Sequence, residues 1–297
     1  MATPFTSFEC AIRHDNARVL TWTLNSLATY PEDFILAVEN SRAGGPWETL
    51  ADDLKDSCFY VDTRRRNYNK YMNECYRLRL TSASTGDNWV SNVVDAGSYG
   101  VYPFSSEAEN VIKQVEKAIE LSGCEGVLLK KKHWGTRCPD CTDFDDQGTV
   151  NEHCPRCLGT GFDGGYYQGI SMPIIKDSIQ TKEEQGDDCV EKDETVQGKC
   201  VAYPWVRYGD VWCEKYTNKR FMIDRVTPTS SYKHVPLVYS LTMHRIEYSD
   251  VMYTPVADDK VDIKDLYDSA HVNYTPVLER EIESASRAKW EEELNKL

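Results

Sequence analysis

Residues 136–165 read TRCPDCTDFDDQGTVNEHCPRCLGTGFDGG and contain two Cys-x-x-Cys pairs separated by twelve residues. Each pair can present two thiolates to one ion from a tight turn, and two such turns complete a closed tetrahedral site. Proline follows the first cysteine of each pair and restricts the turn, while Gly159 and Gly161 permit a positive φ. We therefore predict one structural Zn2+ ion, and its four ligands are Cys138, Cys141, Cys154 and Cys157.

Several alternatives to this zinc site remain at the level of sequence. The four cysteines could form two disulfides or stay as free thiols, although two sequential Cys-x-x-Cys pairs are unusual in redox enzymes. Iron is the chief rival ion for the same thiolate geometry. His133 and His153 are close in sequence, and either could replace a cysteine. Four thiolates leave no open position for water or substrate, so the site is expected to be structural.

The chain before the cysteines is expected to be mainly β. In RVLTWTL, residues 18–24, the residues Leu20, Trp22 and Leu24 alternate with more polar positions, a pattern typical of a half-buried strand. Several such segments at short spacing predict a β-sandwich over residues 1–100. Apolar residues at helical spacing, a Ser106–Glu109 capping box and Gly123 predict a helix over 105–123, followed by a strand at 126–135.

The chain after the cysteines returns to strands. Residues 177–199 are acidic and poor in apolar side chains, so an exposed loop or mobile excursion is expected there. Strand-like segments occupy residues 200–256, and Thr217-Asn218-Lys219 is expected to form a hairpin turn between two of them. A charged amphipathic helix is expected over residues 276–297.

Composition limits the class of protein. The 297 residues carry a formal net charge of −14, with a sequence pI of about 4.9, which disfavours nucleic-acid binding over much of the surface. The start of the chain lacks the pattern of a secretory signal, and no apolar run reaches the length of a membrane span. We expect a soluble protein synthesised in a cytoplasm, with no membrane partner. The remaining seven of the 11 cysteines are expected to be buried, reduced thiols.

The first hundred residues resemble a fibronectin type III domain. The resemblance rests on Trp22 in the second strand, Phe34 opening a third, Trp47 before a turn, and CYRLRLTSASTGDNWVSN at residues 75–92. In that family a tyrosine of the penultimate strand packs into the core, and Tyr76 corresponds to it. A generic β-sandwich is the competing interpretation.

Two further stretches resemble structural proteins of tailed bacteriophages. Residues 128–167, LLKKKHWGTRCPDC…CPRCLGTGFDGGYY, resemble zinc-containing virion proteins, and residues 209–228, GDVWCEKYTNKRFMIDRVTP, resemble head-closure and neck connector proteins with a small β-barrel. CPRCLGTG also matches the repeated cysteine-rich unit of DnaJ-type chaperones, but it occurs once here and no His-Pro-Asp signature is present.

The bacteriophage resemblance implies a virion protein of the neck or head–tail connector. Such a subunit would form a homo-oligomeric ring, with a dodecamer as the expected state, between a portal or adaptor protein and a tail-completion or tail terminator protein. It could also contact packaged DNA. The candidate contact elements are the C-terminal helix and the basic strip, which comprises Lys130, Lys131, Lys132, His133 and Arg137. A solvated strand edge blunted by lysines is the alternative interpretation of this strip. A baseplate or other tail structural protein and a nucleic-acid-binding zinc-ribbon factor are the alternatives.

The complete prediction is a mostly β, multi-domain fold. It comprises a fibronectin-like β-sandwich (1–100), a helix and linking strand (101–135), a zinc ribbon (136–172), a small connector-like β-barrel (173–258) and a C-terminal helical tail (259–297). We expect no enzymatic activity and no catalytic residues, because the motifs of hydrolases, phosphate-binding loops and zinc proteases are missing from the sequence. Acidic pairs such as Asp52-Asp53, Asp145-Asp146, Asp187-Asp188 and Asp258-Asp259 are expected to be solvated.

Overall fold

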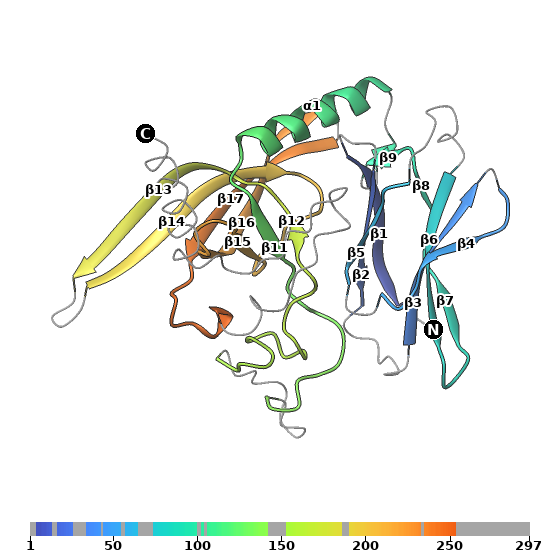
Figure 1. Cartoon of the computed structure of the whole chain (residues 1–297), viewed down its shortest axis with the longest axis horizontal. Helices are drawn as coiled ribbons and strands as arrows, with labels where there is room; N and C mark the ends of the chain where they lie inside the picture. Colours follow the sequence, from blue (N-terminus) through green and yellow to red (C-terminus); the bar gives the residue numbers. More distant parts are fainter. Residues whose placement is uncertain are drawn as a thin grey trace, which may run out of the picture.

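The computed structural model describes residues 4–13, 17–25, 34–42, 44–54, 57–64, 74–99, 102–103, 106–141, 153–185, 190–232 and 235–253. These residues are mostly β, as predicted, and the helix α1 (Ser106–Ser122) lies across one end of the strands (Figure 1). The predicted C-terminal helix at 276–297, the rest of the tail, Cys189 and three of the acidic pairs lie outside the described residues. Within the described part, no helix is both long and apolar enough to cross a membrane.

Two antiparallel sheets form the N-terminal part. The first sheet has the order β1-β2-β5, with β1 (Phe5–Ile12), β2 (Arg18–Leu24) and β5 (Phe59–Asp62). The second has the order β4-β3-β6-β7, with β3 (Phe34–Arg42), β4 (Glu48–Ala51), β6 (Glu74–Ser82) and β7 (Asn88–Val90), and β8 (Val94–Asp95) also pairs with β6. The short strands β9 (Ser98–Tyr99) and β10 (Tyr102–Pro103) pair with each other.

The two sheets enclose an apolar core. Leu20, Trp22 and Leu24 of β2 lie in this core, as their alternation predicts, against Leu36 and Leu78 of the opposite sheet. Tyr76 is fully buried there, and its hydroxyl donates a hydrogen bond of 3.0 Å to the Asp62 carboxylate. The hydroxyl therefore has a partner although the ring is out of contact with water.

A seven-stranded antiparallel sheet forms the second part of the molecule. Its order is β12-β11-β15-β16-β17-β14-β13, and its strands are β11 (Gly126–Leu129), β12 (Ile170–Ser171), β13 (Ile175–Gln185), β14 (Val190–Val201), β15 (Val211–Glu214), β16 (Arg220–Tyr232) and β17 (Val235–Arg245). A short 3-10 helix follows at η2 (Val251–Tyr253). The turn between β15 and β16 lies at residues 215–219, and Asn218 has a φ of 54°, which confirms the predicted hairpin.

The prediction of an exposed loop at residues 177–199 is wrong for the described part of that range, because residues 177–185 and 190–199 belong to the paired strands β13 and β14. The two strands pair from Ile175↔Lys199 to Gln185↔Val190, and the hairpin projects from the sheet (Figure 1). In this register Lys182 lies opposite Asp193, and Glu183 opposite Lys192. Opposite charges across an antiparallel pair favour strand pairing, so an acidic composition did not prevent a ladder.

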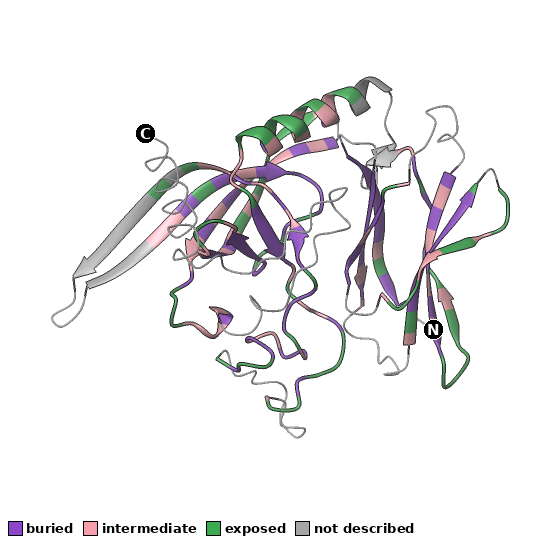
Figure 2. Ribbon diagram, viewed as in Figure 1, coloured by how far each residue is buried: buried purple, intermediate pink, exposed green. Residues whose placement is uncertain are grey.

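The first sheet is buried on both of its faces, so the three large sheets form three layers (Figure 2). Its second face contributes Ile12, Val19 and Phe59 to a core shared with Ile112 of α1 and Leu129 of β11. The expectation that β2 is half-buried is therefore wrong. The polar side of β2 is used for hydrogen bonds to the second part: Thr21 Oγ1 lies 2.5 Å from Tyr203 Oη, and Arg207 donates to Thr23 Oγ1 at 3.2 Å.

The predicted helix is confirmed as α1, with Ile112 and Ile119 on its buried side. It ends where the Gly123 amide donates to the Ile119 carbonyl at 2.8 Å. A Cβ at Gly123 would lie 2.7 Å from that same carbonyl oxygen and 3.1 Å from Pro173 Cβ, so glycine allows the close packing of the helix end.

Most of the scattered cysteines are buried, as predicted. Cys10, Cys58, Cys200 and Cys213 are buried free thiols, whereas Cys75 and Cys124 are partly exposed. Burial raises the pKa of Cys58 and of Cys200 to about 12 and that of Cys213 to about 11. These three thiols therefore stay protonated at neutral pH and behave as small apolar side chains.

Candidate metal centre

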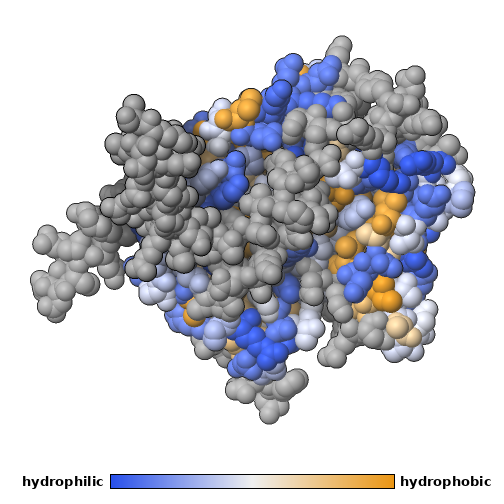
Figure 3. Space-filling view, in the orientation of Figure 1, coloured by the Kyte–Doolittle hydropathy of each residue, from blue (hydrophilic) through white to orange (hydrophobic). Residues whose placement is uncertain are grey.

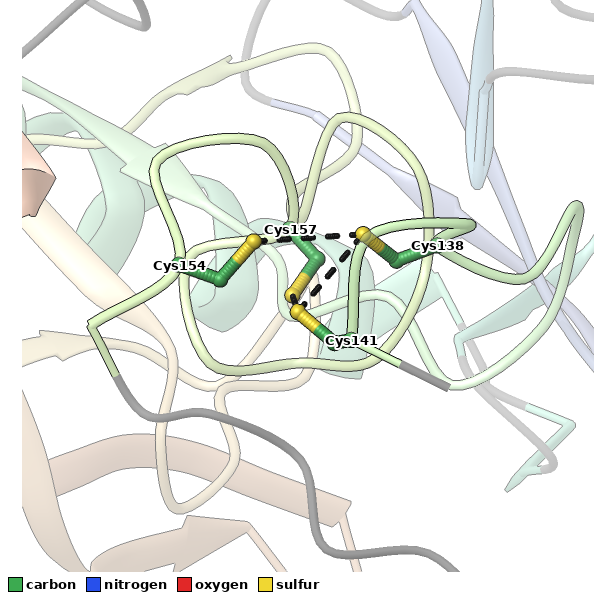
Figure 4. A group of neighbouring side chains, drawn as sticks. All are labelled: Cys138, Cys141, Cys154 and Cys157. Carbon is green, nitrogen blue, oxygen red and sulfur yellow. Dashed lines mark hydrogen bonds between the residues drawn. The ribbon is translucent and has the colours of Figure 1, made fainter. Parts of the chain in front are cut away.

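The four predicted cysteines converge on one point (Figure 4). Their Sγ atoms all lie within 4.8 Å of one another, and the sulfur–sulfur distances include 3.7 Å for Cys138–Cys141, 3.9 Å for Cys138–Cys154 and 3.3 Å for Cys141–Cys157. A tetrahedral ion with metal–sulfur bonds of about 2.3 Å requires sulfurs about 3.8 Å apart. The four side chains can therefore hold a metal ion with little rearrangement.

The backbone around the second pair has the conformation that such a site needs. After Cys157 the chain passes through positive φ at Leu158 (53°), Gly159 (73°) and Gly161 (78°). The Leu158 amide donates to the Cys154 carbonyl at 2.8 Å, which closes a tight turn around the pair. The glycines accept this conformation without steric cost, as the sequence predicts.

The segments that carry the two pairs are joined to each other by backbone and side chains. The Cys138 amide donates to the Gly161 carbonyl at 3.0 Å, and Arg137 forms a β-bridge with Phe162. The Arg156 side chain lies 2.6 Å from Asp163 and 3.7 Å from Asp140, so it connects one pair with the other. These contacts are exposed, and each contributes little free energy by itself.

A further glycine, Gly165, allows residues 162–167 to pack closely against the cysteine cluster. A Cβ at Gly165 would lie 2.7 Å from the Cys157 carbonyl oxygen, and its φ is 67°. Any side chain at this position would push residues 162–167 away from the cysteines. Gly165 is therefore a packing requirement of the metal centre.

Burial and mutual proximity control the ionisation of the thiols. Cys138, Cys154 and Cys157 are buried and Cys141 is partly exposed. A hydrogen bond with the Cys141 thiol lowers the pKa of Cys154 to about 7, whereas burial raises the pKa of Cys138. Several thiolates at such short distances repel one another, so a bound cation is the group that would stabilise all four.

Neither nearby histidine belongs to the cluster that the described residues form. His133 Nδ1 instead lies 3.4 Å from the Lys131 carbonyl oxygen, and its ring meets Tyr167 edge-on at 6.1 Å. His153 borders a separate hollow that is also lined by His244 and Asp250. The four cysteines supply four donor atoms by themselves, so the site does not require a histidine ligand.

The basic strip beside the site is partly used inside the fold. Lys130 forms an ion pair of 2.6 Å with the buried Asp210, and its ammonium also bonds the Trp205 carbonyl. Lys132 donates to the Asp163 carbonyl at 2.9 Å, and the Arg137 guanidinium lies 4.5 Å from the Phe162 ring centre. Sequence reasoning missed Asp210, since nothing in its local pattern shows that it lies beside Lys130.

Trp134 is the second residue that the sequence pattern did not single out. It lies between His133 and Arg137 of the basic strip, yet only 3% of it is exposed, and it packs in the N-terminal core against Phe34 with ring centres 4.5 Å apart. A large aromatic directly before a metal segment was the available signal. The Trp134 side chain anchors the start of the cysteine-containing segment to the N-terminal sandwich.

No model of a known protein family matches the chain, and a search of curated proteins finds no significant relative. The fold and site thus define a mostly β protein with a four-cysteine centre that could hold a metal ion.

Proposed function

We propose that this chain is a zinc-stabilised structural subunit of a tailed-phage virion, located at the neck between the portal or adaptor and the tail. In this proposal Cys138, Cys141, Cys154 and Cys157 hold Zn2+, the chain has no catalytic role, and its copies form a ring. Zinc rather than iron is proposed because it is the usual ion of closed sites with four cysteines and needs no redox partner.

The observation that carries the proposal is the joining, into one unit, of the two stretches that resemble structural proteins of tailed bacteriophages. Residues 128–167 and 209–228 are distant in sequence, but β11 pairs with β15 through Leu128↔Trp212 and Leu129↔Val211. The Lys130–Asp210 ion pair and a hydrogen bond of 3.3 Å from Tyr166 Oη to the Gly209 carbonyl add to this junction. Two stretches that both resemble virion structural proteins are expected to lie together if they belong to one functional unit.

The arrangement of the N-terminal strands supports the fibronectin-like part of the proposal. The first, second and fifth strands form one sheet, and the third, fourth, sixth and seventh form the other. The chain therefore crosses between the sheets, as in sandwiches with Greek-key connections. The buried Tyr76 on β6 matches the core tyrosine of the family.

The surface also agrees better with protein partners than with extended nucleic-acid binding. Hydrophobic residues gather on the visible face of the N-terminal sandwich, between hydrophilic ones (Figure 3). Exposed apolar side chains in the N-terminal part of the chain include Ile35, Val90 and Val93, at 44%, 41% and 55% exposure. Lys130 of the basic strip is neutralised by Asp210, which disfavours the zinc-ribbon DNA-binding alternative.

Quantitative mass spectrometry of purified virions, with metal analysis of the purified chain, tests the proposal. We expect about twelve copies per particle, the ring size that the bacteriophage resemblance implies, and one zinc ion per chain. Cys157→Ser should lose the zinc, while the matched variant Cys75→Ser, outside the cluster, should keep it. About six copies would move the protein to the tail or baseplate, and its absence from all particles would refute the virion function.

A further inference from the structure

A cleft lies between β2 of the first sheet and two segments that adjoin the seven-stranded sheet. Exposed residues line its mouth: Lys131 follows β11, and Trp205, Arg207 and Tyr208 precede β15. We call this site the basic cleft. It has a volume of about 220 Å3, whereas most small-molecule sites have about 300–1,000 Å3. The basic cleft can therefore enclose only a short part of a larger ligand.

The mouth of the basic cleft presents two cations that are not neutralised by a salt bridge. Neither the Lys131 ammonium nor the Arg207 guanidinium forms a salt bridge with another described residue. The neighbouring Lys130, by contrast, is paired with the buried Asp210 at 2.6 Å. In a chain with a formal net charge of −14, two such cations at one mouth attract a local negative charge. The mouth therefore favours a ligand group such as a carboxylate.

The interior of the basic cleft offers hydrogen-bond acceptors. His133 Nδ1 faces the Lys131 carbonyl oxygen at 3.4 Å and carries the proton of the neutral ring, since a carbonyl oxygen can only accept. His133 Nε2 is then an acceptor, and it is buried without a hydrogen-bond partner among the described residues. Glu9 is 6% exposed and lines the same cleft, and no described residue forms a hydrogen bond with its carboxyl. Unpaired acceptors cost free energy, so the interior favours a ligand with N–H donors.

The segment that carries the exposed aromatic residues is held in place by the fold. The Lys130 ammonium bonds the Trp205 carbonyl. The Arg207 amide donates to the Asp210 carboxylate at 2.7 Å. Trp205 and Tyr208 are 38% and 73% exposed, so both rings are available for contact. A preorganised site loses little conformational entropy on binding, and tryptophan, tyrosine and arginine are the residues that contribute most to protein interfaces.

We propose that the basic cleft binds a short acidic peptide segment of a partner protein. A carboxylate of the segment pairs with Lys131 and Arg207, and its backbone N–H groups donate to His133 Nε2 and Glu9. Nucleic acid fits the site less well, because its phosphodiester backbone has no N–H donors and a polyanion is repelled by the net charge of −14. The inference goes beyond the proposed function, since it depends neither on a virion nor on a ring.

An array of blocked heptapeptides tests the site on the purified full-length chain. Each peptide carries a central Asp-Glu pair, and its flanking positions vary. We expect a subset to bind, with a Kd of about 10–100 µM by isothermal titration calorimetry at about 50 mM salt. The Asn-Gln analogue of the best peptide should bind at least about tenfold more weakly, because it lacks the charge. If no peptide binds more tightly than about 1 mM, the inference is overturned.

Variants of the chain separate the basic cleft from a general effect of charge. Lys131→Gln/Arg207→Gln should weaken binding of the best peptide at least about tenfold. The matched variant Lys117→Gln/Arg225→Gln removes the same residue types from exposed positions on α1 and β16 and should leave the Kd unchanged. Tyr208→Ala, at a position that is 73% exposed, should keep the wild-type melting temperature and weaken binding about fivefold.

Two results would contradict a peptide site. Equal affinities of the two double variants for the best peptide would show that the cations of the basic cleft do not hold the carboxylate. Binding of a single-stranded oligothymidylate to the wild-type chain, without binding of any acidic peptide, would assign the cleft to nucleic acid.

Discussion

Replacing Trp134 by alanine should weaken the N-terminal sandwich although the residue lies outside its strands. A buried tryptophan removes about 200 Å2 from water, which corresponds to about 5 kcal/mol at 25 cal/mol per Å2. Measured truncations of buried aromatic residues cost about 3–5 kcal/mol. Since Trp134 is 3% exposed and packs against Phe34, we expect the free energy of unfolding to fall by about 4 kcal/mol.

Urea unfolding followed by circular dichroism measures this loss, and hydrogen exchange locates it. Peptides from β3 and β6 should exchange faster in Trp134→Ala, because the side chain lies in the core between their sheet and β2. Leu121→Ala is the matched control, since Leu121 is 76% exposed on α1 and should cost less than about 0.5 kcal/mol. A loss below about 1 kcal/mol with unchanged exchange in β6 would refute a structural role for Trp134 in the sandwich.

Three further changes test the second part of the molecule and its contact with the first sheet. Gly126→Ala places a Cβ 2.3 Å from Trp212 Nε1, so thermal unfolding should show a loss of about 3 kcal/mol; a wild-type melting temperature would contradict the packing. Asp210→Ala leaves the Lys130 ammonium without its carboxylate and should cost about 3–5 kcal/mol in urea unfolding, whereas an effect as small as that of Asp52→Ala would show that the pair is not buried. Burial raises the pKa of Glu9, so its ionised form opposes folding. The stability that the neutral carboxyl contributes is present below the unfolded-state pKa and is lost as the pH rises through the folded-state pKa. Glu9→Gln should therefore be more stable than wild type at pH 7 and equal to it below about pH 4, and equal stability at both pH values would contradict the burial.

The sequence was sufficient for features that depend on local pattern. The spacing of four cysteines and the following glycines predicted a cluster whose sulfurs the structure brings within 4.8 Å. The alternation in β2 correctly assigned Leu20, Trp22 and Leu24 to one core. Such features follow from turn chemistry and from the two-residue period of a strand, both of which are local.

The errors arose where a residue's surroundings come from a distant part of the chain. Thr21 and Thr23 are polar, which indicated a solvated face, but their hydroxyls meet Tyr203 and Arg207 from the second part. The acidic hairpin was interpreted as a loop because its sequence is acidic and poor in apolar side chains, whereas its register sets lysines opposite acidic residues. Neither the partner of a hydroxyl nor the register of a hairpin can be derived from composition.

The same long-range packing gives the metal centre its place in the fold. The segment that holds the cysteines is anchored at its start by Trp134 in the N-terminal core. At its end Leu158 and Tyr166 belong to the core shared by the first sheet and the seven-stranded sheet. A metal ion bound by all four cysteines would close the chain between these anchors and reduce the entropy of the unfolded state. Metal binding would therefore stabilise the packing between the layers as well as the turns around the ion.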